Sequence, residues 1–388
     1  MKPYIVLRRP APSREGFRTK SMEAGLPPAP KMAVETLSGR DVVDLARDRA
    51  VVAIAPPMPT ALIRPLAATD GDGEAEWGIK AVGAETSPFT GADVTIAILD
   101  TGIANAHPAF AGVQITERDF SGDGDGDRQG HGTHCAGTIL GRSSGPRIGV
   151  APGVERALIG KVLKDDGAGG SEMLFEALQW AADNGANIIS MSLGFDFPGM
   201  VGDLVAKGWP IDLATSTALE AYRGNLRMFD AIMGMFRARA PFGGVPLVVA
   251  AAGNESRRSV DAQYRIAASL PAASQDVISV AAVGPEGEAF RVADFSNSLP
   301  VVSAPGVNIQ SAASGGGLQT MSGTSMACPH VAGVAALWWQ AMRQTSVRPS
   351  AANVAAKLMS TANSQVFGAA FDESDLGQGL VHAPQAGD

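Results

Sequence analysis

Two serines lie three positions apart in the stretch MSGTSMACPH (321–330), just before an apolar helical pattern. Ser325 is predicted at the N-terminus of that helix, where free backbone N–H groups and the helix dipole favour negative charge. Ser322 precedes the turn, too early to share that field, and either Ser322 or Thr324 would make an ordinary N-cap. The pattern therefore favours Ser325 as a nucleophile.

A histidine and a carboxylate could activate such a hydroxyl. His131 opens the stretch GHGTHCAGT (130–138), where an imidazole at a helix start can accept a proton. His131 and His134 could instead bind zinc, but zinc-binding helices space their histidines four apart around a glutamate, which is missing here. Asp100 ends the apolar run DVTIAILD (93–100), at the carboxyl end of a predicted buried strand, although an Asp there can also be a turn residue.

An amide side chain completes the set. Asn254 follows the apolar strand pattern in AAAGNES (250–256), where it is either a turn residue or a donor aimed at developing negative charge. Acid, imidazole, amide and hydroxyl then occur in the order Asp100, His131, Asn254, Ser325, a combination suited to acyl transfer. The residues around Ser325 do not form the G-x-S-x-G elbow of α/β-hydrolases, which excludes that class.

The elements that must position these residues alternate along the chain. Strands buried on both faces are predicted for 93–100, 156–163, 187–194, 245–253 and 276–283. The stretch 171–186 has helical periodicity with Ser171 as its predicted N-cap, and 195–240 predicts an inserted helix or helix pair. This alternation predicts an α/β fold with a mostly parallel central sheet and helices on both faces.

The first 74 residues read differently because they are rich in proline. One short helix and one strand are predicted within VVDLARDRAVVAIAP (42–56), and the acidic stretch ATDGDGEAEWG (68–78) is predicted to be a linker. We therefore expect an N-terminal extension, residues 1–74, and a main domain, residues 75–388.

Composition limits the classes of protein to consider. The 388 residues are 45% hydrophobic and 18% charged, enough for a large core, and the net charge of −8 argues against nucleic-acid binding. We expect no membrane span, because no apolar stretch is long enough. Two cysteines do not make a disulfide framework, and no secretory signal is evident. A cytoplasmic protein is the simplest expectation, and export by another route stays open.

Five ordered blocks resemble the subtilisin-like serine proteases (subtilases, peptidase S8): AILDTGI, GHGTHCAGT, SMSLG, VVAAAGNES and SGTSMACPHVAG. The resemblance extends from Trp77 almost to the end of the chain. It implies a three-layer subtilisin-like fold preceded by a small prosegment-like region.

The resemblance also implies roles for individual residues in a serine endopeptidase that forms an acyl-enzyme. Ser325 resembles the nucleophile and His131 the general base. Asp100 resembles the carboxylate that orients the histidine, and Asn254 the oxyanion-hole donor. The residues that resemble the substrate-binding strands are Ser192, Leu193, Gly194, Ala251, Ala252 and Gly253.

This resemblance implies a protein or peptide as substrate, no cofactor for the chemistry, and the prosegment as an intramolecular inhibitor. No metal ligands can be assigned. A structural calcium ion is compatible with the family, but the loop 140–152 lacks the oxygen ligands of relatives. The loop 119–130, with Asp119, Asp123, Asp125 and Asp127, is interpreted as a solvated acidic loop.

Further expectations follow from the resemblance. His134 would be structural, and Cys135 and Cys328 would be buried thiols near the site. The insert 195–240 would form a wall of the cleft, and self-cleavage would fall between about residues 66 and 76. Two alternatives stay open, a narrow processing peptidase for one partner precursor and an inactive peptide-binding protein that keeps the fold.

Overall fold

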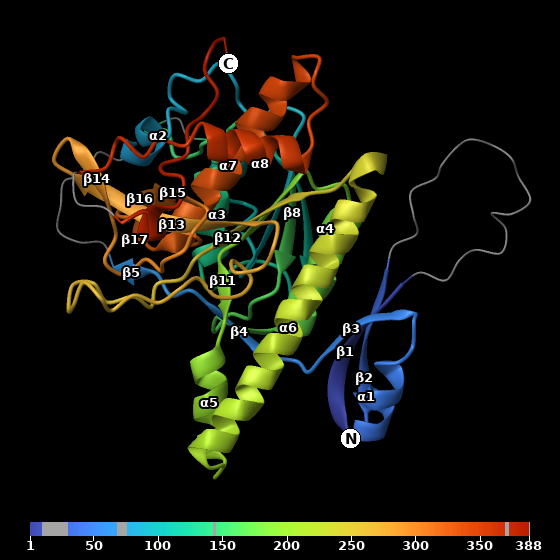
Figure 1. The fold of residues 1–388 in the computed structure, drawn as a ribbon. Helices are drawn as coiled ribbons and strands as arrows, with labels where there is room; N and C mark the ends of the chain where they lie inside the picture. The colour runs from blue at the N-terminus through green and yellow to red at the C-terminus, as the bar shows by residue number, and fades with distance from the viewer. Residues whose placement is uncertain (10–29, 68–75, 143–144, 369–371, 388) are drawn as a thin grey trace, which may run out of the picture.

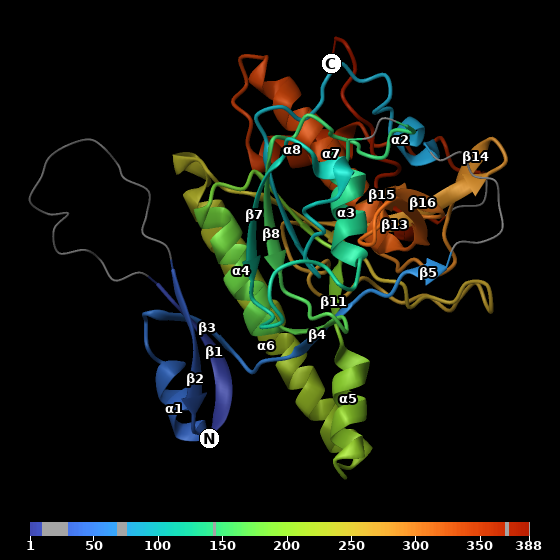
Figure 2. The same ribbon diagram turned by 180° about the vertical axis from the view of Figure 1, so that it is seen from behind.

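The computed structural model describes residues 1–9, 30–67, 76–142, 145–368 and 372–387. Its centre is an eight-stranded sheet between two layers of helices (Figures 1 and 2). The strands, in spatial order, are β14 (Ala289–Val292), β13 (Val277–Glu286), β12 (Leu247–Ala251), β10 (Ile188–Met191), β6 (Thr95–Asp100), β8 (Arg156–Lys161) and β7 (Gln114–Asp119), and β15 (Val302–Pro305) also pairs with β13. Every pairing is parallel except that of β13 with β14, which confirms the predicted mostly parallel sheet.

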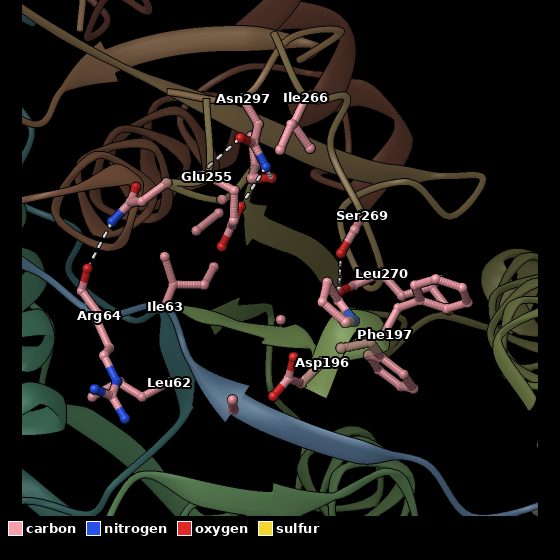
Figure 3. A pocket seen from close by; sticks show the side chains of 18 of the residues that line it. Leu62, Ile63, Arg64, Asp196, Phe197, Glu255, Ile266, Ser269, Leu270 and Asn297 are labelled. Carbon is pink, nitrogen blue, oxygen red and sulfur yellow. Dashed lines mark hydrogen bonds between the residues drawn. The ribbon is translucent and has the colours of Figure 1, made fainter. Parts of the chain in front are cut away.

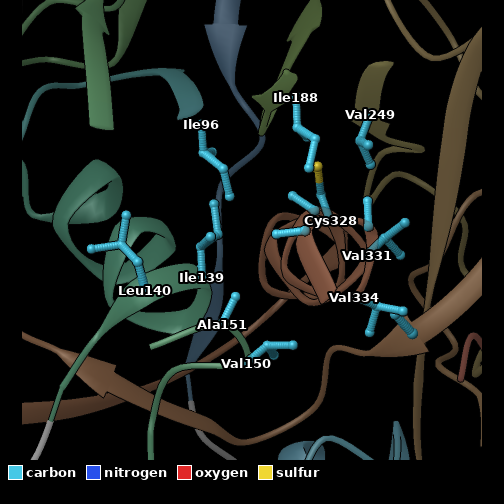
Figure 4. Packing of buried hydrophobic residues seen from close by; sticks show 14 of the residues in the cluster. Ile96, Ile139, Leu140, Val150, Ala151, Ile188, Val249, Cys328, Val331 and Val334 are labelled. Atoms are coloured by element: carbon cyan, nitrogen blue, oxygen red, sulfur yellow. The ribbon is translucent and has the colours of Figure 1, made fainter. Parts of the chain in front are cut away.

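Helices cover both faces of this sheet because its strands are apolar on both sides. The helices of one layer are α3 (His131–Leu140), α7 (Thr324–Arg343) and α8 (Ala351–Ser360), and those of the other are α4 (Ser171–Asp183) and α6 (Ile211–Arg239). In β6, Ile96 and Ile98 belong to the core of the first layer, which Figure 4 shows around α7, whereas Ala97 and Leu99 belong to that of the second. Each fully buried Ile or Leu contributes about 1.5–3 kcal/mol to this packing.

Two smaller sheets flank the central one. The first is antiparallel and consists of β11 (Leu193–Phe195), β4 (Pro59–Leu62) and β9 (Ala168–Gly170), with β4 in the middle. The second consists of β16 (Ile309–Ala312), β17 (Leu318–Ser322) and β5 (Leu66–Ala67). The remaining short elements are α2 (Trp77–Ala81), η2 (Pro108–Phe110), η3 (Ala240–Phe242) and α9 (Glu373–Leu376).

The N-terminal part forms a sheet of its own, in the order β2 (Lys31–Leu37), β1 (Lys2–Arg8) and β3 (Val51–Ala55), together with α1 (Gly39–Leu45). The helix and the strand predicted within 42–56 are both present. The chain then leaves this sheet at Ala55 and enters the main body as β4 and β5, before the acidic stretch 68–78, most of which lies outside the described residues.

The insert is a helix pair, as predicted, made of α5 (Phe197–Ala206) and α6. With 29 residues, α6 is about 43 Å long. One side of α6 is buried, at positions that include Ala218, Met228 and Phe229. Figure 1 shows α6 between the central sheet and the N-terminal sheet, so the helix supports both. Among the described residues, no helix combines the length and apolarity of a membrane span.

The predicted N-caps are wrong in two helices. Gly170, not Ser171, is the N-cap of α4, and the Ser171 hydroxyl instead accepts a hydrogen bond from the Met58 N–H. Gly323 is the N-cap of α7, because Ser322 and Thr324 bond to other segments of the chain. Tertiary hydrogen bonds therefore outcompete local capping at both positions.

We expect Gly333→Ala in α7 to lower the free energy of unfolding by about 1–3 kcal/mol, because overpacking strains a filled core. A Cβ atom at this position would lie 2.5 Å from Val150 Cβ. The matched control is Gly202→Ala in exposed α5, where no atom lies within 4 Å of the added methyl group. That change should stabilise the helix by up to about 1 kcal/mol. Urea unfolding measures both effects, and equal stabilisation by both would contradict the packing argument.

Candidate active site

Asp100 and His131 form a buried hydrogen-bonded pair where β6 ends and α3 begins. The Asp100 Oδ1 atom lies 2.7 Å from His131 Nδ1 and also accepts the Thr101 N–H at 2.8 Å. Since an ionised carboxylate only accepts, this contact assigns the proton to Nδ1. His131 Nε2 has no hydrogen-bond partner among the described residues, so it is available to accept a proton.

Asp127 fixes the start of α3, a role that the sequence does not predict. Its Oδ1 accepts from the Thr101 hydroxyl at 2.9 Å and from the Gly130 N–H at 2.7 Å. Its Oδ2 accepts from the Thr133 N–H at 2.8 Å and from the Thr133 hydroxyl at 2.6 Å. The solvated acidic loop expected here is therefore wrong for Asp127, which is buried. The available signal was an Asp a few positions before a helix start.

Ser325 is buried at the second position of α7, and its hydroxyl faces another part of the chain. Ser325 Oγ lies 3.3 Å from the Ile63 carbonyl oxygen and 3.4 Å from that of Ser192. It makes no hydrogen bond to His131 among the described contacts. The two helices nevertheless meet here, because Cys135 Sγ lies 3.4 Å from the Ser325 carbonyl oxygen and 3.8 Å from His131 Nδ1.

Asn254 directs its amide N–H groups toward the same segment. Its Oδ1 accepts from both the N–H and the hydroxyl of Thr324, each at 2.9 Å. The Nδ2 atom donates to the Arg64 carbonyl oxygen at 3.1 Å. A Cβ atom at Gly323 would lie 2.9 Å from Nδ2, so a glycine there leaves room for the amide.

The other predicted site residues lie beside β4, on and just before β11 and at the end of β12. Leu193 and Gly194 of β11 pair with Leu62 and Ala61 of β4. The Ser192 hydroxyl donates to the Ser325 carbonyl oxygen at 3.1 Å. Ala251, Ala252 and Gly253 line a cavity of about 670 Å³ beside β4, and Figure 3 shows Ile63 and Leu270 at this cavity. The structure thus gathers the predicted residues around one extended segment of the same chain.

Three further titratable groups near the site, His134, Cys135 and Cys328, are buried. Burial lowers the pKa of His134 to about 3, and its Nε2 bonds to the Ile309 carbonyl, as expected for a structural residue. Cys135 and Cys328 are free buried thiols, as predicted, and burial raises the pKa of Cys328 to about 11. Burial also raises the pKa of Cys135, and the ligand atoms of Asp100, His131 and Cys135 all lie within 4.8 Å of one another.

The acidic loop supplies its own hydrogen-bond donors. Asp119 accepts the N–H groups of Ser121, Gly122 and Gly124. Burial opposes its ionisation, but these bonds outweigh burial and lower its pKa. The buried ammonium of Lys161, the last residue of β8, donates to the Gly126 carbonyl oxygen of this loop at 2.9 Å. The Asp119 carboxylate is therefore occupied by backbone donors rather than presented to a cation.

Comparisons with known proteins agree with this arrangement. The sequence profile of the subtilase family matches residues 91–380. Alkaline elastase YaB of Bacillus sp. (strain YaB) is 34% identical over 321 residues, which cover 80% of this chain and 69% of the elastase. Subtilisin BL of Lederbergia lenta is 33% identical over 319 residues, which cover 80% of this chain and 97% of the subtilisin.

A solved structure shows a similar fold. Fervidolysin from Fervidobacterium pennivorans, a keratinolytic enzyme related to subtilisin, has a TM-score of 0.69 and 23% sequence identity, covering 98% of this chain and 60% of fervidolysin. Because the family profile spans most of the chain and the aligned relatives exceed 30% identity, the chain belongs to the subtilase family of serine endopeptidases.

Proposed function

We propose that Ser325, His131, Asp100 and Asn254 perform peptide-bond hydrolysis through an acyl-enzyme on Ser325. His131 Nε2 takes the Ser325 proton as Oγ attacks the carbonyl carbon, and the imidazolium then protonates the leaving amine. Asp100 holds the ring and stabilises the imidazolium, and Asn254 Nδ2 donates to the oxyanion. The observation that carries this proposal is the 3.3 Å contact between Ser325 Oγ and the carbonyl oxygen of Ile63, the residue that directly follows β4.

The N-terminal region acts as an intramolecular substrate and inhibitor. In support, β4 lies between β9 and β11 as an antiparallel strand, the way an extended substrate adds to exposed sheet edges. Leu62 donates its N–H to the Gly167 carbonyl at 2.9 Å, and Ile63 follows directly at the nucleophile. While this strand is in place, another polypeptide cannot reach Ser325.

The scissile bond is Ile63–Arg64. The sequence predicts cleavage between about residues 66 and 76, but the register of β4 favours a bond a few residues earlier. Ser325 contacts the Ile63 carbonyl whereas Asn254 contacts that of Arg64. To stabilise the oxyanion, the Asn254 side-chain amide must donate to the carbonyl oxygen of the bond that is attacked. Cleavage therefore needs a small shift of the segment that brings the Ile63 carbonyl oxygen to Asn254 Nδ2.

The enzyme prefers an apolar residue before the scissile bond. Ile63 lines the cavity together with Ala251, Ala252 and Leu270, and its Cγ1 lies 3.6 Å from the Cβ position at Gly194. An apolar side chain fills such a pocket without leaving buried polar atoms unpaired.

The insert forms one wall of this cleft. Phe197 of α5 and Leu219 and Tyr222 of α6 line the same cavity, and the Tyr222 hydroxyl accepts the Leu270 N–H at 3.2 Å. Such a wall limits the polypeptides that can enter, which favours selective processing over broad degradation.

We expect the wild-type chain to cleave itself after Ile63 and to label with a fluorophosphonate probe, because Ser325 is the nucleophile. Ser325→Ala should stay intact at the Ile63–Arg64 bond and take no label. Intact-mass spectrometry and in-gel fluorescence measure the two outcomes. An inactive peptide-binding protein would give an unlabelled, uncleaved wild type, and labelling of Ser325→Ala would reject the assigned nucleophile.

We expect Asp127→Asn to lower kcat at least tenfold, because each Asp127 oxygen accepts two hydrogen bonds and an amide would set N–H groups against donors. The start of α3, and with it His131, would then shift. Peptide hydrolysis and urea unfolding are measured on the same preparations. The matched control is Asp125→Asn in the exposed part of the loop, which should match wild type. If both variants match wild type, Asp127 does not position His131.

A further inference from the structure

The strand in the cleft is held by its backbone well upstream of the scissile bond. Met58 donates its N–H to the Ser171 hydroxyl at 3.0 Å, and its carbonyl accepts the Ser171 N–H at 3.0 Å. Leu62 bonds to Gly167 on the same edge, whereas Pro59 accepts the Asp196 N–H on the other. Successive residues thus bond alternately to the two edges of the gap, and Pro56 lies just upstream of this ladder, which begins at Met58.

Residue 56 lies against α6. The Asn225 side chain donates Nδ2–H to the Pro56 carbonyl oxygen at 2.9 Å. The helix has a glycine, Gly224, where the segment passes over it. A Cβ atom at this position would lie 3.2 Å from Pro56 Cδ and 3.4 Å from Ala55 Cβ. A glycine inside a helix costs about 1 kcal/mol relative to alanine. Here it lets the extended segment approach the helix backbone closely.

This segment accepts a hydrogen bond from the amide nitrogen of Asn225 but donates none to its amide oxygen. The side chain is fully buried, and its Oδ1 has no hydrogen-bond partner among the described residues. A carboxamide that donates to the C=O of an extended residue can accept the N–H of that same residue, as in a strand pair. Residue 56 is a proline and has no N–H, so it cannot donate a hydrogen bond to Asn225 Oδ1.

We propose that Asn225, with Gly224, forms a subsite that reads the backbone of the eighth residue before the scissile bond. The subsite takes an extended polypeptide whose residue at this position is not proline and gives it two hydrogen bonds instead of one. The chain's own segment fills the groove but uses the subsite incompletely, so a substrate with an N–H there binds more tightly. This inference rests on the proposed cleavage of the Ile63–Arg64 bond, because the position of residue 56 is counted back from that bond.

The test uses self-processed enzyme, active-site-titrated with a fluorophosphonate, and fluorogenic peptides with the sequence of residues 55–67. We expect the peptide with Pro56→Ala to raise kcat/KM about fivefold over the natural sequence, the effect of one added hydrogen bond. The matched control is the peptide with Pro57→Ala, which loses the same ring stiffness but places its new N–H one residue after the C=O that Asn225 binds. It should change kcat/KM less than twofold.

The enzyme variant Asn225→Leu, similar in volume but without polar atoms, should cleave the natural and Pro56→Ala peptides equally well. If this variant does not fold, the peptide comparison on wild-type enzyme still decides. Equal rates for the Pro56→Ala and Pro57→Ala peptides would overturn the subsite. Failure of the enzyme to cleave any of the peptides would instead contradict the proposed function, so the two failures are distinguishable.

Discussion

The site depends on two sheet edges that lie one strand apart. β9 and β11 do not pair with each other, and β4 lies between them and pairs with both. Unpaired backbone groups at an edge attract an extended chain, so this gap binds any polypeptide strand of suitable shape. In the function that we propose, the hydrogen bonds that now hold the N-terminal segment also bind the substrate. Ser325 lies at the point where that strand ends, next to the Ile63 carbonyl.

Much of the fold and of the site could be predicted because the necessary signals are local. Asp100 ends a strand that is apolar on both faces, and His131 and Ser325 lie at helix starts, so sequence alone indicates where these groups gather. The role of Ser171 and the contact of Asp127 with Thr101 could not be predicted. Both depend on partners that folding brings together, Met58 in one case and Thr101 in the other, and a pattern along the chain carries no information about such contacts.

The insert links the N-terminal sheet to the chemistry. α6 contacts β3 and receives the chain at Pro56 just before it becomes β4, so the helix guides the segment into the cleft. Its small residue at Gly224 and its buried amide at Asn225 would be liabilities in an ordinary surface helix. Both have a role if α6 extends the proposed substrate cleft beyond β9, because both contact the extended segment at Pro56.

Some buried polar atoms on and around the occupying strand have no hydrogen-bond partner among the described residues. Among the described residues, Thr60 Oγ1 of the strand itself, Asp100 Oδ2 and His131 Nε2 near the nucleophile, and Asn225 Oδ1 upstream are buried without a hydrogen bond. Each such atom costs about 1–3 kcal/mol, which offsets part of what the backbone ladder contributes. The N-terminal segment is therefore held by its backbone and by the buried side chains of Met58, Leu62 and Ile63, and Thr60 Oγ1 is its unpaired buried polar atom among the described residues. In the function that we propose, this occupant covers the nucleophile until its covalent link is cut, and the unpaired atoms around it favour its replacement by a substrate that satisfies them.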